Sequence, residues 1–259
     1  MGLHSWWQVD AAMKLAFHTL DVFTTRKFAG NPLAVVLNAD HLSTDQMQTI
    51  TKEFNLSETT FVMKPENRDN TAKVRIFFPG GEMPFAGHPT IGTAILLAEL
   101  NNKPGCTIST EIKLELKAGI TPVKVTRIAD HCSAVLTAPI VPFHVDVPLP
   151  SVAATARALN LTADDIGFDG HKITSLEGGP RFFYVPVKSR AALEKSKVIE
   201  PFWSELIKPL GNGVDAAYLY ARGGDAPQPR SVRACIRPRG AFRKTRPQDR
   251  PLRCSLPNY

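Results

Sequence analysis

A short segment rich in glycine and proline, residues 79–92 (PGGEMPFAGHPTIG), carries residue types suited to holding a small anion. It comes immediately before an apolar stretch that is typical of a buried helix, so free amides of the first helical turn would face a loop that lets a ligand come close. The positive end of a helix dipole favours negative charge there. Gly87 and Gly92 have P-loop spacing, but Thr93-Ala94 stands where Lys and Ser or Thr are required, and no G-x-G-x-x-G occurs. A small carboxylate therefore fits better than a nucleotide.

His88 stands at the entrance of this expected helix. The helix dipole disfavours the protonated imidazole, so His88 could donate or accept a hydrogen bond as a neutral ring near physiological pH. From the residues alone, a histidine that only caps the helix is the simpler interpretation.

Glu58 lies in a second segment of interest, residues 55–62 (NLSETTFV), where it begins an apolar strand. Partial burial there would raise the pKa of its carboxyl toward neutrality, as a group that both accepts and returns a proton requires. A solvated glutamate at the end of a strand is the simpler alternative.

The other histidines and the cysteines show no metal-binding or disulfide pattern. No paired ligand spacing links the remaining histidines, so we expect no metal site. The four cysteines stand far apart without a C-x-x-C pair, so reduced thiols are expected. These residues are His4, His18, His41, His131, His144, His171, Cys106, Cys132, Cys235 and Cys254.

The expected elements around these segments are strands with a few helices between them, an α+β pattern. Residues 15–23 and 32–37 suggest a hairpin. Ser43 with Gln46 forms a capping box that predicts an amphipathic helix over 44–54. Pro89 suits a first helical position, and the residues after it are apolar on nearly every side, which is typical of a buried helix. Further strands are expected at 59–63, 72–78, 112–116, 123–128, 133–137, 182–187 and 217–220, with helices at 152–159 and 202–210.

The composition indicates a folded protein that does not span a membrane. The chain has 259 residues, 43% hydrophobic and 21% charged, which is enough apolar material for a packed core. It has no apolar run of about 18 residues, and residues 1–12 lack the features of a secretory signal. We therefore expect a cytoplasmic location.

The net charge of +7 comes entirely from the end of the chain. Residues 222–259 hold nine Arg and one Lys against two Asp, together with six prolines and no strand or helix periodicity. This tail is expected to be disordered or weakly attached. A basic arm that binds nucleic acid is one interpretation. Translation in a shifted frame or a truncated gene model is favoured, because aromatic residues suited to base stacking are not interleaved with the arginines.

Three blocks in this order resemble the PhzF family of phenazine-biosynthesis-like isomerases. They are residues 13–36 (MKLAFHTLDVFTTRKFAGNPLAVV), residues 55–62 (NLSETTFV) and residues 75–94 (RIFFPGGEMPFAGHPTIGTA). A weaker similarity continues through 178–182 to 218–220 and brings the resemblance to about 200 residues. Residues 1–12 lie outside it, which suggests an N-terminal extension before a natural start at Met13.

The resemblance implies a diaminopimelate-epimerase-like fold, with two lobes that each wrap a curved sheet around a central helix and a site in the cleft between them. We expect the first lobe at 13–118, a partial second lobe at 119–221, and the tail at 222–259. Family members are cofactor-free and commonly homodimeric.

By resemblance, Glu58 corresponds to the glutamate that shuttles a proton across a dihydro-hydroxyanthranilate ring, and His88 to the histidine that assists it. The resemblance thus favours catalytic roles for both over the simpler interpretations. A small substrate carrying a carboxylate would be held at the helix start and the adjoining loops. The expected substrate-binding residues are Asn31, Ser57, Gly87, Pro89, Thr90 and Gly179.

The family pattern breaks off after residue 220. Relatives continue with a strand and an E-D-P-x-T-G-S/N-like block that supplies a catalytic aspartate, whereas this chain enters the arginine-rich tail. The second lobe is therefore expected to be incomplete and the activity impaired. Two alternatives stay open. One is a non-enzymatic binding protein that uses a remnant cleft and the basic tail, although nucleic acid is disfavoured as its partner. The other is a thiol-dependent epimerase of small amino acids.

Overall fold

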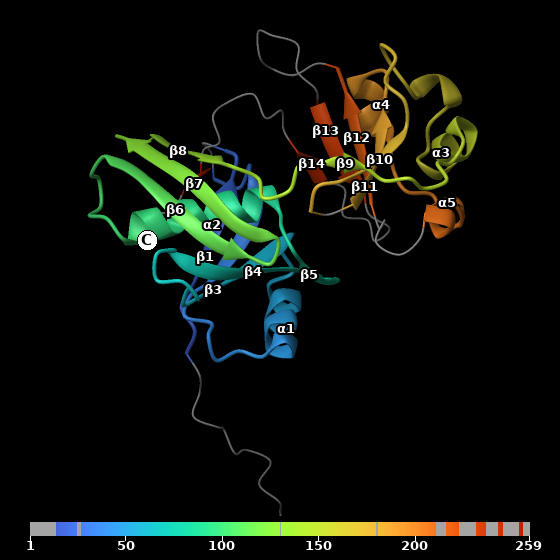
Figure 1. The fold of residues 1–259 in the computed structure, drawn as a ribbon. Coiled ribbons are helices and arrows are strands. Elements are labelled where there is room, and N and C mark those ends of the chain that lie inside the picture. Colours follow the sequence, from blue (N-terminus) through green and yellow to red (C-terminus); the bar gives the residue numbers. More distant parts are fainter. Residues whose placement is uncertain are drawn as a thin grey trace, which may run out of the picture.

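The computed structural model describes residues 14–24, 27–129, 131–179, 181–210 and 216–222, and three short strands between residues 232 and 255 (Figure 1). The strands are β1 (Phe17–Val22), β2 (Asn31–Val36), β3 (Glu58–Met63), β4 (Ala72–Phe78), β5 (Gly81–Met83), β6 (Ile108–Leu116), β7 (Gly119–Ile128), β8 (His131–Leu136), β9 (Phe143–His144), β10 (Thr174–Glu177), β11 (Arg181–Pro186), β12 (Ala217–Ala221), β13 (Val232–Ile236), β14 (Arg243–Thr245) and β15 (Cys254–Ser255). The helices are α1 (Thr44–Phe54), α2 (Gly87–Leu100), α3 (Val152–Ala158), α4 (Arg190–Lys195) and α5 (Phe202–Ile207), with 3₁₀ turns η1 (Ala163–Asp165) and η2 (Lys208–Leu210). The expected N-terminal extension, residues 1–12, lies outside the described residues.

The first sheet belongs to residues 14–136, which we call the first unit. Its strands follow the order β15-β1-β2-β3-β4-β6-β7-β8, and β5 pairs with β4. The pairs β2–β3 and β4–β6 are parallel, and the others are antiparallel. The predicted hairpin of the first two strands is confirmed, with Phe17 opposite Val36 and Val22 opposite Asn31.

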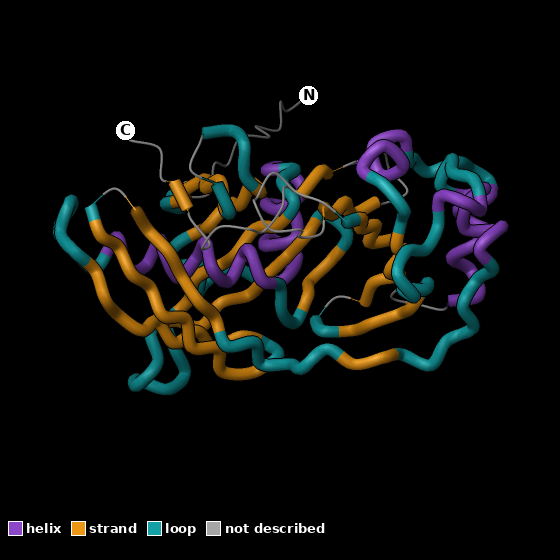
Figure 2. The backbone as a smooth tube through the Cα atoms, turned by 90° about the horizontal axis from the view of Figure 1, so that it is seen from above, coloured by secondary structure: helices purple, strands orange, loops and turns teal. Residues whose placement is uncertain are grey.

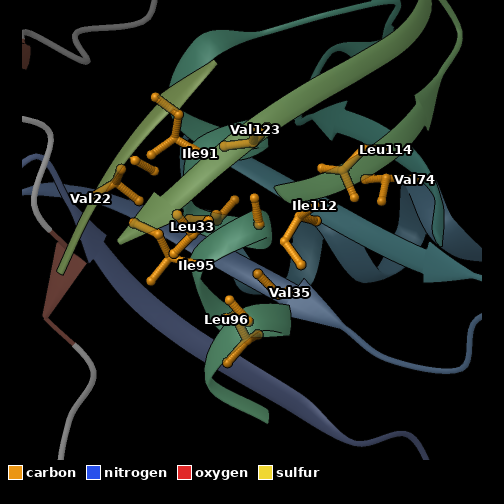
Figure 3. Packing of buried hydrophobic residues seen from close by; sticks show 14 of the residues in the cluster. Val22, Leu33, Val35, Val74, Ile91, Ile95, Leu96, Ile112, Leu114 and Val123 are labelled. Atoms are coloured by element: carbon orange, nitrogen blue, oxygen red, sulfur yellow. The ribbon is translucent and has the colours of Figure 1, made fainter. Parts of the chain in front are cut away.

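Helix α2 lies inside the curve of this sheet (Figure 2). It contacts strands from both ends of the sheet order, including β1, β2, β7 and β8. Ile91, Ile95 and Leu96 are at most 2% exposed and pack against Val22, Leu33 and Val123 in one cluster (Figure 3). An apolar helix is stable here because the sheet removes nearly its whole surface from water. The prediction of a buried helix is confirmed.

Helix α1 covers the outer face of the same sheet and occupies the predicted residues. Ser43 accepts a hydrogen bond from the Gln46 amide, and the Gln46 side chain accepts one from the Ser43 amide, which completes the predicted capping box. Met47 is fully buried in a second cluster with Phe61 and Phe77, so the helix attaches to β3 and β4 through its apolar stripe.

The first sheet continues past the boundary that we expected after residue 118. β6 and β7 form one long hairpin, in which Ile108 pairs with Arg127 and Leu116 with Gly119. β8 then adds to β7, and its residues Cys132 and Ala134 are buried in the α2 cluster. The chain therefore leaves the first sheet after Leu136, because β7 and β8 are needed to enclose the helix.

The second sheet belongs to residues 143–222, which we call the second unit. Its strand order is β14-β13-β12-β11-β10-β9, with β11 and β12 parallel. Phe183, Val185 and Leu219 are fully buried against residues of α3, α4 and α5. The predicted strands at 182–187 and 217–220 and the helices at 152–159 and 202–210 are present with shifted ends, whereas β10 and α4 were not predicted.

Three short strands fall in the range expected to be a disordered tail. β13 pairs with β12, β14 with β13, and β15 with β1. The rest of 223–259 lies outside the described residues, so its state stays a prediction. Within the described ranges, every helix is too short or too polar to cross a lipid bilayer.

Candidate active site

The starts of two parallel strands bring the first site residues together. β2 begins at Asn31 and β3 begins at Glu58, with Leu33 in register with Glu58. Neighbouring parallel strands begin at the same edge of a sheet, so both side chains lie at one edge. Gly30 is required just before Asn31, because a Cβ there would lie 2.6 Å from the Val22 carbonyl oxygen. The close turn leads the chain straight into Asn31.

Helix α2 begins at the same edge, two residues earlier than predicted. Ala86 is the N-cap and gives no side-chain cap, so Gly87, His88 and Pro89 form the first turn. Pro89 is buried and has no amide hydrogen, so it contributes no donor. The amides of Gly87 and His88 are therefore the first-turn donors of this helix, and Gly87 is exposed.

Thr90, an expected substrate-binding residue, has hydrogen bonds within the first turn of α2. Its side chain is fully buried, and its hydroxyl donates to the Ala86 carbonyl oxygen at 2.7 Å. Its backbone amide donates to the same oxygen at 3.3 Å. The hydroxyl and the backbone amide of Thr90 therefore both donate to the N-cap carbonyl and close the first turn of α2.

Glu58 and His88 form a close, sheltered pair. The Oε2 atom of Glu58 lies 3.1 Å from Nε2 of His88, and the side chains are 11% and 9% exposed. This excludes the alternative of a fully solvated glutamate at a strand end. In a sheltered site, water screens the carboxyl–imidazole interaction less than at the surface.

Asn31 and Ser57 extend this pair on the far side of the imidazole. The Asn31 Nδ2 atom lies 3.0 Å from Nδ1 of His88, and the Ser57 hydroxyl donates to Asn31 Oδ1 at 3.0 Å. The ring of Phe23 stands edge-on to the imidazole with centroids 6.4 Å apart. Sequence reasoning did not single out Phe23, because an apolar residue at a strand end carries no chemical signal.

The second unit touches the first beside the start of α2. Gly179 has φ +114°, and a Cβ there would lie 2.7 Å from the Phe85 carbonyl oxygen, one residue before the N-cap. Gly179 was predicted to bind substrate. In the structure, the backbone of Gly179 is the part of the second unit that contacts the first unit at the edge of the site.

The two described thiols lie away from this edge. Cys106 follows the C-terminal end of α2, which is about 20 Å from its start, and Cys132 is buried in the sheet. Burial raises the pKa of Cys132 to about 11, so this group stays a protonated thiol near neutral pH and offers little thiolate for catalysis. Among the described residues, no group of three His, Cys, Asp or Glu could hold a metal ion.

Comparisons with known proteins place this chain among the isomerase-like proteins that its sequence resembles. Residues 20–211 match the family model described as phenazine biosynthesis-like protein, PhzC-PhzF. An uncharacterized isomerase of Mesorhizobium japonicum is 40% identical over 206 residues, which is 78% of this chain and 66% of the relative. A trans-2,3-dihydro-3-hydroxyanthranilate isomerase of Pseudomonas aeruginosa is 35% identical and covers 67% of this chain and 58% of the relative. This chain thus spans less than two thirds of the length of these curated relatives.

Solved structures agree on the fold. A predicted epimerase of Pseudomonas aeruginosa superposes with a TM-score of 0.65 at 26% identity, covering 82% of this chain and 74% of that one. A PhzF-family phenazine biosynthesis protein of Bacillus anthracis superposes with a TM-score of 0.69 at 24% identity, covering 86% and 72%. The expected α+β fold is confirmed, and the chain belongs to the phenazine biosynthesis-like PhzC-PhzF family.

Proposed function

We propose that this protein is a cofactor-independent isomerase that moves a proton between two carbons of one small carboxylate-bearing substrate. Glu58 is the group that carries the proton. The observation that supports this most directly is the sheltered Glu58–His88 pair at the open start of α2. The family membership and the printed activity of the Pseudomonas aeruginosa relative support the same reaction class.

The reaction needs one group that acts first as a base and then as an acid. The Glu58 carboxylate takes a proton from a substrate carbon, and the electron pair of that C–H bond moves into the conjugated system. The protonated carboxyl then delivers the proton to another carbon, where a new C–H bond forms. Substrate and product are isomers and Glu58 returns to its starting state, so no oxidant or reductant is consumed.

His88 assists this cycle through its contact with Glu58 Oε2. A hydrogen bond from the ring nitrogen stabilises the carboxylate between turnovers. The Gly87 and His88 amides hold the substrate carboxylate at the positive end of α2, which fixes the carbon skeleton beside Glu58. The homodimer implied by the resemblance and the cytoplasmic location expected from the composition stay predictions.

The test uses the full chain with trans-2,3-dihydro-3-hydroxyanthranilate and a panel of carboxylated cyclic dienes. NMR follows the shift of double bonds in H₂O and the incorporation of deuterium at carbon in D₂O. We expect Glu58→Gln to lower the rate at least about 1000-fold, because the amide cannot accept the proton. Glu53→Gln, on the exposed side of α1, is the matched control and should keep the parent rate.

Two results would contradict this proposal. One is a Glu58→Gln variant as active as the parent. The other is a parent chain that converts no member of the panel and exchanges no carbon-bound hydrogen. Circular dichroism of each variant shows whether a lost rate comes from lost folding.

A further inference from the structure

Two hydrogen bonds and one close nitrogen–oxygen contact run in series from Ser57 to Glu58. The Ser57 hydroxyl meets Asn31 Oδ1 at 3.0 Å, and Asn31 Nδ2 meets His88 Nδ1 at 3.0 Å. His88 Nε2 then meets Glu58 Oε2 at 3.1 Å. Two neighbouring residues in the sequence, Ser57 and Glu58, thus stand at opposite ends of a path through Asn31 and the imidazole.

The chemistry of the amide fixes the direction of every bond along this path. An amide oxygen only accepts, so the Ser57 hydroxyl is the donor to Asn31. An amide nitrogen only donates, so Nδ1 of His88 must accept and carries no proton. The one proton of the neutral imidazole is then on Nε2, the nitrogen that lies 3.1 Å from Glu58 Oε2.

We propose that Asn31, held by Ser57, is a positioning residue that keeps His88 as the neutral tautomer protonated at Nε2. This inference rests on the proposed function in taking Glu58 as the proton carrier. The Asn31 Nδ2 group faces Nδ1 of His88, and Nδ1 can accept a hydrogen from it only when it carries no proton of its own. Asn31 was predicted to bind substrate, but here both ends of its amide bond to protein groups.

A neutral imidazole suits a carboxyl that must both take and return a proton. An imidazolium beside Glu58 would stabilise the carboxylate strongly and make it a weaker base, and it would also offer a competing acidic proton. A neutral N–H donor orients the carboxyl with a smaller effect on its basicity. Asn31 thereby acts on the reaction through His88.

The backbone makes this arrangement rigid. Asn31 is paired with Val22 across the β1–β2 hairpin, and Ser57 comes directly before β3, the parallel neighbour of β2. His88 is fixed by the first turn of the buried helix α2. Groups on strands and helices hold a hydrogen-bond geometry more closely than groups on loops.

The protonation state can be read directly, without any activity measurement. The full chain is labelled with ¹⁵N-histidine, and the His88 signals are assigned by their loss in His88→Gln. At pH 7.5 we expect an unprotonated Nδ1 and a protonated Nε2 in the parent. Asn31→Asp keeps the shape of the side chain but replaces the Nδ2 donor by an oxygen that accepts. Both ring nitrogens of His88 should then be protonated. The matched control is Asn38→Asp at an exposed residue two positions after the end of β2, which should leave the spectrum unchanged.

Ser57→Ala gives a second variant that does not add charge. Without the hydroxyl donor, the Asn31 amide can turn over, and we expect signals of both neutral tautomers of His88. In the substrate assay, Asn31→Asp should lower kcat about 100-fold with little change in KM, because the proton transfer and not the binding is affected.

The outcomes separate this inference from the proposed function. A parent His88 protonated at Nδ1, or an Asn31→Asp variant whose Nδ1 stays unprotonated, would overturn the role of Asn31 even if Glu58 is catalytic. The expected spectra in a parent chain that isomerises no substrate would support the tautomer assignment and overturn the proposed function alone.

Discussion

The two units of this protein bury their sheets in different ways. In the first unit the sheet curves around α2, and nine residues of that helix are buried. In the second unit α3, α4 and α5 cover one face of the sheet, where Phe183 and Val185 are fully buried. Phe182, Tyr184 and Tyr218 form an aromatic cluster on the opposite face and are partly exposed.

This difference explains which unit holds the site. The first unit contributes Asn31, Glu58 and His88 from two strand starts and one helix start, all fixed by the same enclosed core. The second unit reaches the site through the backbone of Gly179. The first unit thus holds the proposed proton-transfer groups, and the second unit contacts it beside the start of α2.

The largest expected effect concerns the two faces of the second sheet, of which one is buried under helices and the other is partly exposed. Phe183→Ala should lower the free energy of unfolding by about 3–5 kcal/mol, because it leaves a cavity among α3, α4 and α5. Tyr184→Ala, the next residue on the opposite face, should cost about 1 kcal/mol. Urea unfolding followed by circular dichroism measures both. Equal losses would show that the aromatic face is as well packed as the helical face.

A smaller effect tests the contact between the units. Gly179→Ala should lower the free energy of unfolding by about 2 kcal/mol, because its Cβ meets the Phe85 carbonyl oxygen and its φ is positive. We expect kcat/KM to fall about 10-fold as Phe85 shifts the start of α2.

Gly170→Ala is the matched control for this contact. Gly170 also has a positive φ, but a Cβ there meets nothing within 4 Å. It should cost about 1 kcal/mol from backbone strain alone and leave kcat/KM unchanged. Equal kcat/KM values for the two variants would show that the Gly179 contact does not influence the site.

Local sequence signals predicted much of the fold. The capping box at Ser43 and Gln46 predicted the observed start of α1, since both halves of that motif are short-range. The β6–β7 hairpin was missed because the boundary between the lobes was placed after residue 118, between its two strands. Pro122 in fact lies within β7, opposite Lys113, although proline is uncommon in a strand with neighbours on both sides.

Local sequence signals predicted less of the candidate site than of the fold. Asn31 and His88 are separated by 57 positions, and only the strand and helix starts of the fold bring them within hydrogen-bond distance. From the residues alone, Glu58 and His88 each had a simpler interpretation, and the family resemblance was needed to favour catalytic roles. The direction of the hydrogen bonds through Asn31 could not be predicted. It depends on whether the nitrogen or the oxygen of the Asn31 amide faces His88.

The smallest expected effect concerns the stability lost in acid when a paired carboxylate is protonated. Each unit has a carboxyl group whose pKa is lowered. In the first unit, Arg75 binds both oxygens of Glu82 at 2.8 and 3.0 Å and also donates to Thr44, so this pair joins β4 and β5 to the start of α1. The Arg75 hydrogen bonds hold the pKa of Glu82 below its ordinary value of 4.5. In the second unit, hydrogen bonds from Lys195 and Thr162 lower the pKa of Asp165 to about 2.

A carboxyl whose pKa is lowered by folding stabilises the folded state above its unfolded pKa, and this contribution is lost as the pH falls through the folded pKa. Glu82→Gln should therefore cost about 1 kcal/mol at neutral pH, and the difference from the parent should shrink once the pH falls below about 4.5. Glu66→Gln is the control, because Glu66 pairs with Lys73 while 74% exposed and should give no measurable loss. Urea unfolding at a series of pH values measures the difference. A Glu82→Gln deficit that stays constant down to pH 3 would mean that the Arg75 pair does not stabilise the first unit through the charge of Glu82.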